Sequence, residues 1–305
     1  MKISGYTTTY NCRNMWYPIK ECVESLLLFC DEVCIVDAGS QGEELTYIQE
    51  IAKDSRVKLE VSPVDFSHPR WAMHIDGYLK AQARDMCTGD VCFQIDSDQI
   101  VSEKQIDDTI RVCEIANDKK IIVGLHQVEF WGALDTVRSD LAPKPMISPN
   151  LPNITHGIRR GAKALDSEGR EYCTPFISDS CDFINKHNHE AISTGGYANA
   201  PLIYHVSWLN LERKVDHYKK FWHKFHQSMY NLAEDHNAMF DKPWENVDNI
   251  DVQKMAKKLE SLGPRPFHSY EETWQGKSRP ITKVEIQNMP KSLTTWYDAL
   301  LHKSD

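Results

Sequence analysis

Two aspartates two positions apart are the most chemically suggestive feature of this 305-residue sequence. Asp96 and Asp98 follow the apolar run VCFQI, which is typical of a buried strand. In an extended segment residues two apart point the same way, so both carboxylates can face one point outside the sheet. Such oxygen ligands suit Mg²⁺ or Mn²⁺, which in many sites also contact substrate phosphates. The spacing alone leaves a second interpretation open, a polar turn at the surface.

The segments that must position these aspartates alternate between strand and helix patterns. Strands are expected in KISGYTT, EVCIVDAGS, VKLEV, VCFQI and KIIVGLHQVEF, and helices in IKECVESLLLF, ELTYIQEIA, WAMHIDGYLKAQARDMC and SEKQIDDTIRVCEIA. This order predicts an α/β fold with a mainly parallel sheet, which binds ligands beyond the carboxyl ends of its strands. Asp37, in DAGS, and Asp96 both fall at such ends, which predicts a site there.

After residue 130 the alternation of strand and helix patterns ends. Residues 131–190 are less regular, and Pro143, Pro145, Pro149 and Pro152 break the pattern there, which is typical of a substrate-binding region with loops. Apolar residues from Leu211 to Leu232 recur at steps of four and three, which predicts a helix with a core-facing stripe. We therefore expect an α/β part in 1–130, a less regular part of the same domain in 131–206, and a helical C-terminal region in 207–305.

Composition restricts the function classes. The formal net charge of −9 argues against a protein that wraps nucleic acid through its phosphates. No apolar run is long enough to span a bilayer, so no integral membrane segment is expected. Nine cysteines without a CxxC pair are typical of reduced, buried thiols. These observations together favour a cytoplasmic protein.

Three motifs occur in the order TTTYN, IVDAGSQG and TGDVCFQIDSDQ. Together they resemble the motifs of family-2-like glycosyltransferases with the GT-A fold, over about the first 100 residues. The later segments HGIRRG, NHEAISTGG and APLIYHVSW resemble bacterial lipopolysaccharide-core glucosyltransferases. The resemblance implies a Rossmann-like, GT-A-like sheet, with residues 1–130 as the nucleotide-sugar-binding part and 131–206 as the acceptor-side part of the same domain. It also implies sugar transfer, with inversion, from a nucleoside-diphosphate sugar to a glycan or other hydroxyl acceptor, with UDP as the expected carrier.

The resemblance also implies a cation site and a catalytic base. Asp98 would bind Mn²⁺ or Mg²⁺ directly, with Asp96 beside it on the ribose or on a metal-bound water, and His205 as a third ligand. Glu190 is the first candidate for the general base that deprotonates the acceptor hydroxyl. Asp182 and Asp179 in SDSCD are the alternatives.

Four further residues are expected to line the nucleotide pocket: Thr9, Asn11, Asp37 and Lys80. Other interpretations stay open, because Lys80 could be a helix-surface lysine, Asn11 a turn residue and His205 a structural histidine. Trp131 could stack on a sugar or close the core.

Two rival functions remain. A nucleotidyltransferase would have a similar sheet and acidic site, but its usual glycine-rich first loop is replaced here by TTYNCRNMWYP. A catalytically inactive relative would bind a sugar or a protein without turnover, and the intact DSD argues against it.

Overall fold

The computed structural model describes residues 1–64, 69–138, 143–157, 163–165, 171–173, 183–187, 192–195, 200–217, 219, 251–262 and 289–301. Ten of its strands form one sheet: β1 (Ile3–Thr9), β2 (Glu32–Asp37), β3 (Val57–Val61), β4 (Val91–Gln94), β5 (Gln99–Val101), β6 (Ile122–Trp131), β7 (Val137–Arg138), β8 (Lys144–Pro149), β13 (Thr194–Gly195) and β14 (Leu202–Trp208). Two separate pairs join β9 (Ile154–His156) to β12 (Phe183–Asn185) and β10 (Lys163–Leu165) to β11 (Glu171–Cys173).

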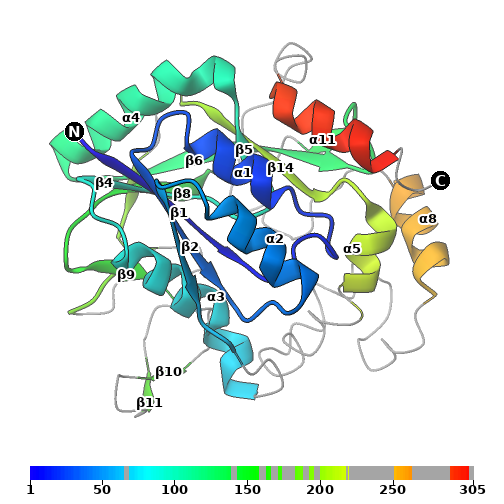
Figure 1. Cartoon of the computed structure of the whole chain (residues 1–305), viewed down its shortest axis with the longest axis horizontal. Coiled ribbons are helices and arrows are strands. Elements are labelled where there is room, and N and C mark those ends of the chain that lie inside the picture. The colour runs from blue at the N-terminus through cyan, green and yellow to red at the C-terminus, as the bar shows by residue number, and fades with distance from the viewer. Residues whose placement is uncertain are drawn as a thin grey trace.

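The described helices are α1 (Ile19–Leu26), α2 (Glu43–Ile51), α3 (Pro69–Asp85), α4 (Ile106–Lys119), α5 (Leu211–His217), α8 (Val252–Leu262) and α11 (Lys291–Leu301). A short 3₁₀ helix, η1 (Glu103–Gln105), precedes α4, and the Ser102 hydroxyl caps it by accepting from the Lys104 backbone amide. Figure 1 shows the helices arranged around the sheet. None of the described helices is long and apolar enough to cross a membrane.

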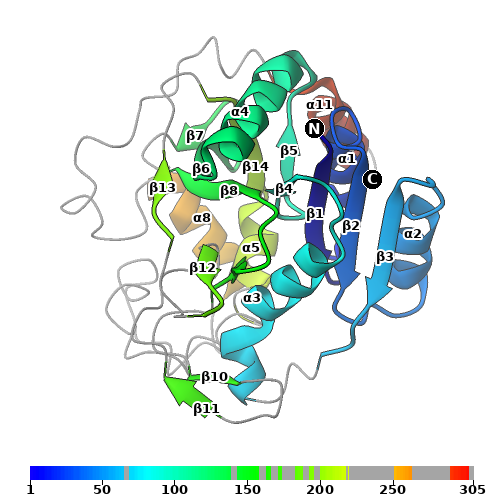
Figure 2. The ribbon, with the colours of Figure 1, turned by 90° about the vertical axis from the view of Figure 1, so that its left-hand side faces the viewer.

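The sheet has the strand order β3-β2-β1-β4-β8-β6-β14-β5, with β7 and β13 also paired to β6. Its first part is parallel, because β1 pairs in parallel with both β2 and β4, and β2 with β3. Figure 2 shows this parallel part with α2 beside β3 at the edge. β8 enters antiparallel between β4 and β6, so residues after 131 contribute to the same sheet. The predicted α/β fold, a mainly parallel sheet flanked by helices, is confirmed.

Among the strands that were not predicted, β5 matters most for the site. β5 follows the two aspartates directly and pairs antiparallel with β14 in the register Tyr204↔Ile100 and His205↔Gln99. Its three residues are too few to show a period of two, so only the tertiary pairing reveals it. This pairing brings β14 next to the DSD segment.

Both faces of the sheet are buried, and β2 shows how the sequence produces this. Val33 and Ile35 belong to the core that α1 and α2 cover, while Cys34 and Val36 belong to the cluster on the opposite face, where α3 packs. This alternation follows from the two-residue period of a strand. Full burial of such side chains stabilises the fold by about 1.5–3 kcal/mol each.

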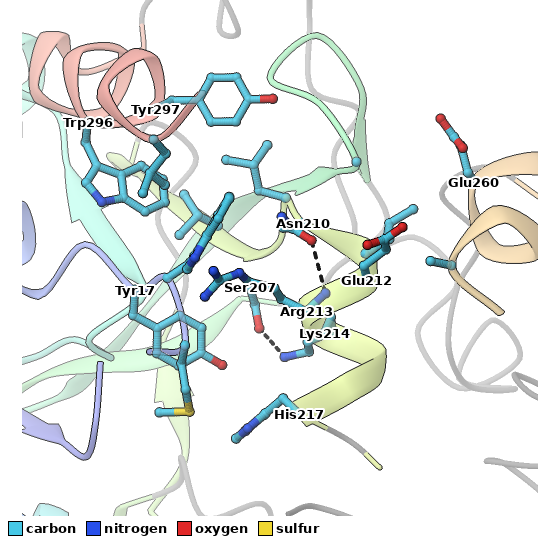
Figure 3. A pocket seen from close by; sticks show the side chains of 18 of the residues that line it. Tyr17, Ser207, Asn210, Glu212, Arg213, Lys214, His217, Glu260, Trp296 and Tyr297 are labelled. Carbon is cyan, nitrogen blue, oxygen red and sulfur yellow. Dashed lines mark hydrogen bonds between the residues drawn. The ribbon is translucent and has the colours of Figure 1, made fainter. Parts of the chain in front are cut away.

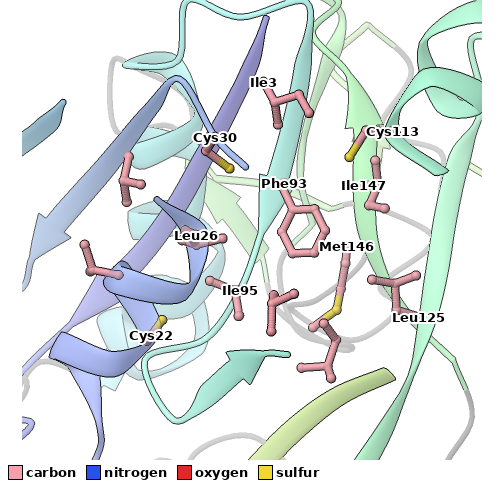
Figure 4. Close-up of a cluster of buried hydrophobic side chains, with 14 of the residues drawn as sticks. Ile3, Cys22, Leu26, Cys30, Phe93, Ile95, Cys113, Leu125, Met146 and Ile147 are labelled. Atoms are coloured by element: carbon pink, nitrogen blue, oxygen red, sulfur yellow. The ribbon is translucent and has the colours of Figure 1, made fainter. Parts of the chain in front are cut away.

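The larger core lies under α1 and α4. Figure 4 shows Phe93 of β4 surrounded by Leu26, Ile147 and Met146, with Cys113 of α4 nearby. Among the described side chains, seven of the nine cysteines are buried and free: Cys12, Cys22, Cys30, Cys34, Cys87, Cys92 and Cys113. They pack as small apolar side chains, as expected from the sequence.

The C-terminal helices cover the far part of the sheet. Trp131 and Trp208 stack with ring centroids 5.1 Å apart, and the Trp131 indole N–H donates to the Leu259 carbonyl at 3.3 Å. Trp131 is only 4% exposed, so it closes the core between the sheet and α5 and α8. Leu211 and Val215 of α5 are buried in the same cluster, as the apolar stripe predicts. The rest of that stripe, to Leu232, lies outside the described residues.

Candidate functional site

The carboxyl ends of β1, β2 and β4 form one edge of the sheet. Thr9 is opposite Asp37 in the β1–β2 register, and the Ile95 amide, just past β4, donates to the Tyr6 carbonyl at 3.1 Å. The prediction that the DAGS and DSD segments fall at the carboxyl ends of strands is therefore confirmed, with β2 and β4 on either side of β1. In a sheet of this kind such an edge is where ligands bind.

Asp37 organises the loop after β2. Its Oδ1 accepts from the backbone amides of Gly39 and Ser40, at 3.0 and 2.6 Å, and its Oδ2 accepts from the Ser40 hydroxyl at 2.7 Å. The side chain is completely buried. Gly39 has a φ of +101°, which favours glycine, so the turn and its carboxylate depend on each other. A contact of Asp37 with the nucleotide stays a prediction.

Thr9 and Asn11 lie beside that loop. Asn11 has a φ of +47°, and its backbone N–H donates to the Ser40 hydroxyl at 2.9 Å. This hydrogen bond joins the loop after β1 to the loop after β2. The Thr9 hydroxyl lies 2.7 Å from the Cys12 sulfur, and the Thr9 carbonyl accepts from the Ala38 amide. These two residues thus shape the edge of the sheet where the nucleotide was predicted to bind.

Asp96 lies between two lysines. Lys80 Nζ is 3.1 Å from its Oδ1, Lys144 contacts its Oδ2, and Gln94 Nε2 donates to Oδ1 at 2.7 Å. Burial by itself raises the pKa of Asp96, but Lys144 and Lys80 outweigh burial and hold that pKa well below its usual value. Lys80 also contacts Asp76 at 3.2 Å and is only 2% exposed, so it is not a helix-surface lysine.

Asp98 lies on the other side, against β14. His205 Nε2 is 3.2 Å from Asp98 Oδ2, and His205 Nδ1 is 3.3 Å from Glu129 Oε1, without the alignment of a hydrogen bond. Burial opposes protonation of His205, yet the two carboxylates raise its pKa to about 9. Burial likewise raises the pKa of Asp98, but the imidazole outweighs it and the net pKa lies below the usual value. The two carboxylates therefore favour the protonated imidazole, and a cation bound by His205 would have to displace that proton, because only the neutral imidazole is a metal ligand.

A third lysine lies near this cluster. Lys214 of α5 donates to the hydroxyl of Ser207, two residues past His205, and its Nζ is 5.0 Å from the centre of the Trp208 ring. Burial lowers the pKa of Lys214, although Asp98 and Glu129 act in the opposite direction. The aspartates of the DSD segment are therefore surrounded by cationic side chains from three parts of the chain.

The side chains near Asp98 include two metal-ligand types. A carboxylate oxygen and an imidazole nitrogen both suit Mn²⁺, and they already lie together in Asp98 and His205. Asp96 differs, because both of its oxygens are in contact with lysines. Over the described ranges, no three His, Cys, Asp or Glu side chains are grouped so as to hold a metal ion. The donor types of Asp98 and His205 suit a cation, and Asp96, Asp98 and His205 all stay predictions as metal ligands.

Three residues of this site were missed from the sequence: Lys144, Glu129 and Lys214. Glu129 gave a signal, since a carboxylate between Val128 and Phe130 in an apolar strand must find a buried partner. Lys144 stands between two prolines, 48 residues after Asp96, and no local pattern connects them. The candidate bases Glu190, Asp182 and Asp179 lie outside the described residues.

No protein-family model matches this chain, and no curated protein matches it at a significant level. Among solved structures, the chain is similar to S. aureus TarS 1–349, with 13% sequence identity and a TM-score of 0.41. Structures of S. aureus TarS 1–349 in complex with UDP and with UDP-GlcNAc match with TM-scores of 0.45, at 14% and 13% identity. Each match covers 98% of this chain and 92% of the other. The function proposed below rests on the site itself.

Proposed function

We propose that this protein transfers a sugar from a nucleoside-diphosphate sugar, with UDP as carrier, to a hydroxyl acceptor. The observation that carries the proposal is the DSD segment at the carboxyl end of β4, where Asp96 meets Lys80 and Lys144 and Asp98 meets His205. Such a concentration of buried charge at a ligand-binding edge suits a substrate whose own charge is concentrated in a diphosphate. The ordered motifs TTTYN, IVDAGSQG and TGDVCFQIDSDQ support the same assignment.

Each group has a part in this scheme. The nucleoside lies over the loops at Thr9, Asn11 and Asp37, and the diphosphate lies near Lys80 and Asp96. Asp98 and His205 hold a divalent cation, Mn²⁺ or Mg²⁺, which when bound supplies positive charge against the leaving diphosphate. Lys80 can move its contact from Asp96 to a phosphate oxygen without becoming an unpaired buried charge.

The transfer itself needs a base. The acceptor oxygen forms a bond to the anomeric carbon while the bond from that carbon to the diphosphate oxygen breaks, and the hydroxyl proton passes to a carboxylate. Glu190 is the first candidate for this carboxylate and Asp182 the second. Attack opposite to the leaving group inverts the configuration at the anomeric carbon.

Thermal melting with UDP, GDP and CMP, each with and without Mn²⁺, tests the proposal. A ligand that binds only the folded protein stabilises it by about 2.7 kcal/mol at a hundredfold excess over its Kd. We expect a Mn²⁺-dependent rise in Tm with UDP that is lost in Asp98→Asn, a substitution that keeps the side-chain volume. Asp107→Asn on the exposed face of α4 is the matched control and should respond as the wild type does.

The outcomes separate the rival functions. The absence of a shift with every nucleotide would overturn the proposal. A Mn²⁺-dependent shift with UDP and no consumption of any UDP-sugar would instead favour a binding protein on the same fold.

A further inference from the structure

A cavity of about 470 Å³ lies beside the candidate site, between the loop after β1, the end of β14 and helices α5, α8 and α11 (Figure 3). Its volume falls within the range of small-molecule sites, roughly 300–1,000 Å³. Among the described residues that line it, none is Thr9, Asn11, Asp37, Lys80 or Asp96. The cavity is therefore distinct from the edge where the nucleotide is proposed to bind.

One side of the cavity is aromatic. Trp16 and Tyr17 come from the loop after β1, and Trp296 and Tyr297 come from α11. All four are partly buried, so each ring is fixed by packing and keeps part of its surface open. Flat rings of this kind offer an apolar face and, in Tyr and Trp, a polar edge. A pyranose ring, with one face of C–H groups and a rim of hydroxyls, matches such a surface.

The opposite side is polar. Figure 3 shows Asn210, Glu212 and Glu260 across the cavity from Trp296 and Tyr17. Within the described part of the chain, the exposed carboxylates Glu212 and Glu260 have neither a hydrogen bond nor an ion pair. Carboxylates accept hydrogen bonds only, so they suit a ligand that brings several hydroxyl donors.

The charge of the lining favours a neutral ligand over a nucleotide. The cations Lys214, Lys257 and Arg213 are set against the carboxylates Glu212 and Glu260. Arg213 is already engaged, since its guanidinium lies 3.8 Å from the centre of the Trp16 ring and donates to the Asn14 carbonyl at 2.7 Å. Asp96 at the proposed diphosphate site is paired with Lys80 and Lys144, whereas no ion pair of Glu212 or Glu260 is found within the described residues, so these two carboxylates would repel a diphosphate.

The cavity is also connected to the reaction centre. Ser207 and Val206 line it and directly follow His205 on β14. Lys214, which also lines it, contacts Ser207 and lies close enough to Asp98 to lower the pKa of that carboxyl. A ligand in the cavity thus lies next to the proposed sugar-transfer centre, on the β14 side of the DSD segment.

From these features we propose that the cavity is the acceptor subsite and that the acceptor is a carbohydrate whose pyranose ring stacks on the Trp296 side while its hydroxyls donate to Glu212 and Glu260. This inference rests on the transferase function proposed above, since it names the second substrate class of the same site. The engaged Arg213 and the packed rings form the subsite before the ligand arrives, which limits the entropy lost on binding.

Saturation-transfer NMR with a panel of methyl hexopyranosides tests the inference on the full chain. Each glycoside is offered at ~20 mM, which fills a site of millimolar Kd. We expect at least one glycoside to bind the wild type, with a roughly tenfold weaker Kd in Glu260→Gln and no binding in Trp296→Ala. Glu114→Gln, an exposed glutamate of α4 that does not line the cavity, is the matched control and should bind as the wild type does.

UDP with Mn²⁺ distinguishes this inference from the proposed function. Both cavity variants should keep the wild-type UDP melting shift, and UDP should not displace the glycoside. Three results would overturn the inference: failure of every glycoside to bind the wild type, binding as tight as wild type in both Glu260→Gln and Trp296→Ala, or displacement of the glycoside by UDP. If glycosides bind as expected while UDP leaves the Tm of the wild type unchanged, the carbohydrate site stands and the transferase function fails.

Discussion

Replacing Lys144 by Met removes one of the two cations that hold Asp96. The Lys144 ammonium contacts Asp96 Oδ2, and the two side chains are 9% and 29% exposed. Met keeps most of the length of the side chain, so the substitution removes charge with little change in packing. Asp96 then retains Lys80 at 3.1 Å and Gln94 at 2.7 Å.

The expected loss of stability follows from these remaining partners. Breaking a buried ion pair costs about 3–5 kcal/mol when the surviving charge is left unpaired. Asp96 keeps two partners and some contact with solvent, so we expect a smaller cost, about 1–3 kcal/mol. Asp96→Asn should reduce that cost, because Lys144 then has no carboxylate to lose.

Urea unfolding followed by tryptophan fluorescence, without added metal or nucleotide, measures the effect. Wild type, Lys144→Met, Asp96→Asn and the double variant form a double-mutant cycle, for which we expect a coupling of about 0.5–3 kcal/mol. Lys104→Met at the exposed η1 is the matched control and should stay within about 0.5 kcal/mol of the wild type. A Lys144→Met protein as stable as the control, or a cycle without coupling, would refute the charge arrangement described for Asp96.

Three further predictions concern the framework of the site. Burial opposes ionisation of Glu32, but its contacts with Lys58, Ser4 and Thr88 outweigh burial and lower the pKa of Glu32. The ionised side chain therefore stabilises the fold at pH values above the pKa of Glu in the unfolded chain, about 4.3. That contribution falls progressively as the pH drops from about 4.3 towards the lower folded pKa. Urea unfolding should show Glu32→Gln less stable than wild type at pH 7, with a smaller gap at pH 3; a constant gap would contradict this. Tyr6→Phe leaves the buried His156 Nε2 without its hydroxyl partner and should cost about 1–3 kcal/mol in urea, whereas Tyr78→Phe, at a residue 44% exposed, should cost far less. Gly39→Ala forces a Cβ to 3.0 Å from Pro63 Cα at a φ of +101° and should lower stability by about 1–3 kcal/mol, while Gly42→Ala, which meets nothing within 4 Å, isolates the strain of positive φ.

The parallel part of the sheet could be predicted because its signals are local. EVCIVD is apolar on both faces and is followed by a turn sequence, so the strand, its burial and the position of Asp37 follow from residues that are adjacent in the chain. The same holds for VCFQ and the aspartates after it. The rule that ligands bind at the carboxyl ends of parallel strands then placed the candidate site.

The partners of the aspartates could not be predicted in the same way. Lys144 reaches Asp96 because β8 enters antiparallel between β4 and β6, and Glu129 reaches His205 because β6 and β14 are neighbours. Both depend on strand order, which hydrophobic periodicity does not specify. The sequence therefore indicated where charged groups would lie, but it did not indicate that each carboxylate oxygen of Asp96 would contact a lysine.

Release of UDP from UDP-sugars tests the central proposal most directly, because it requires turnover as well as binding. The wild type is incubated with a panel of UDP-hexoses and UDP-N-acetylhexosamines, with Mn²⁺ and a mixture of glycoside acceptors, and UDP and product are measured by mass spectrometry. We predict release of UDP from at least one donor together with a product heavier by one sugar residue, both lost in Asp98→Asn and both retained in Asp107→Asn. Intact donors after prolonged incubation of a folded wild type, or equal turnover in Asp98→Asn, would contradict the account.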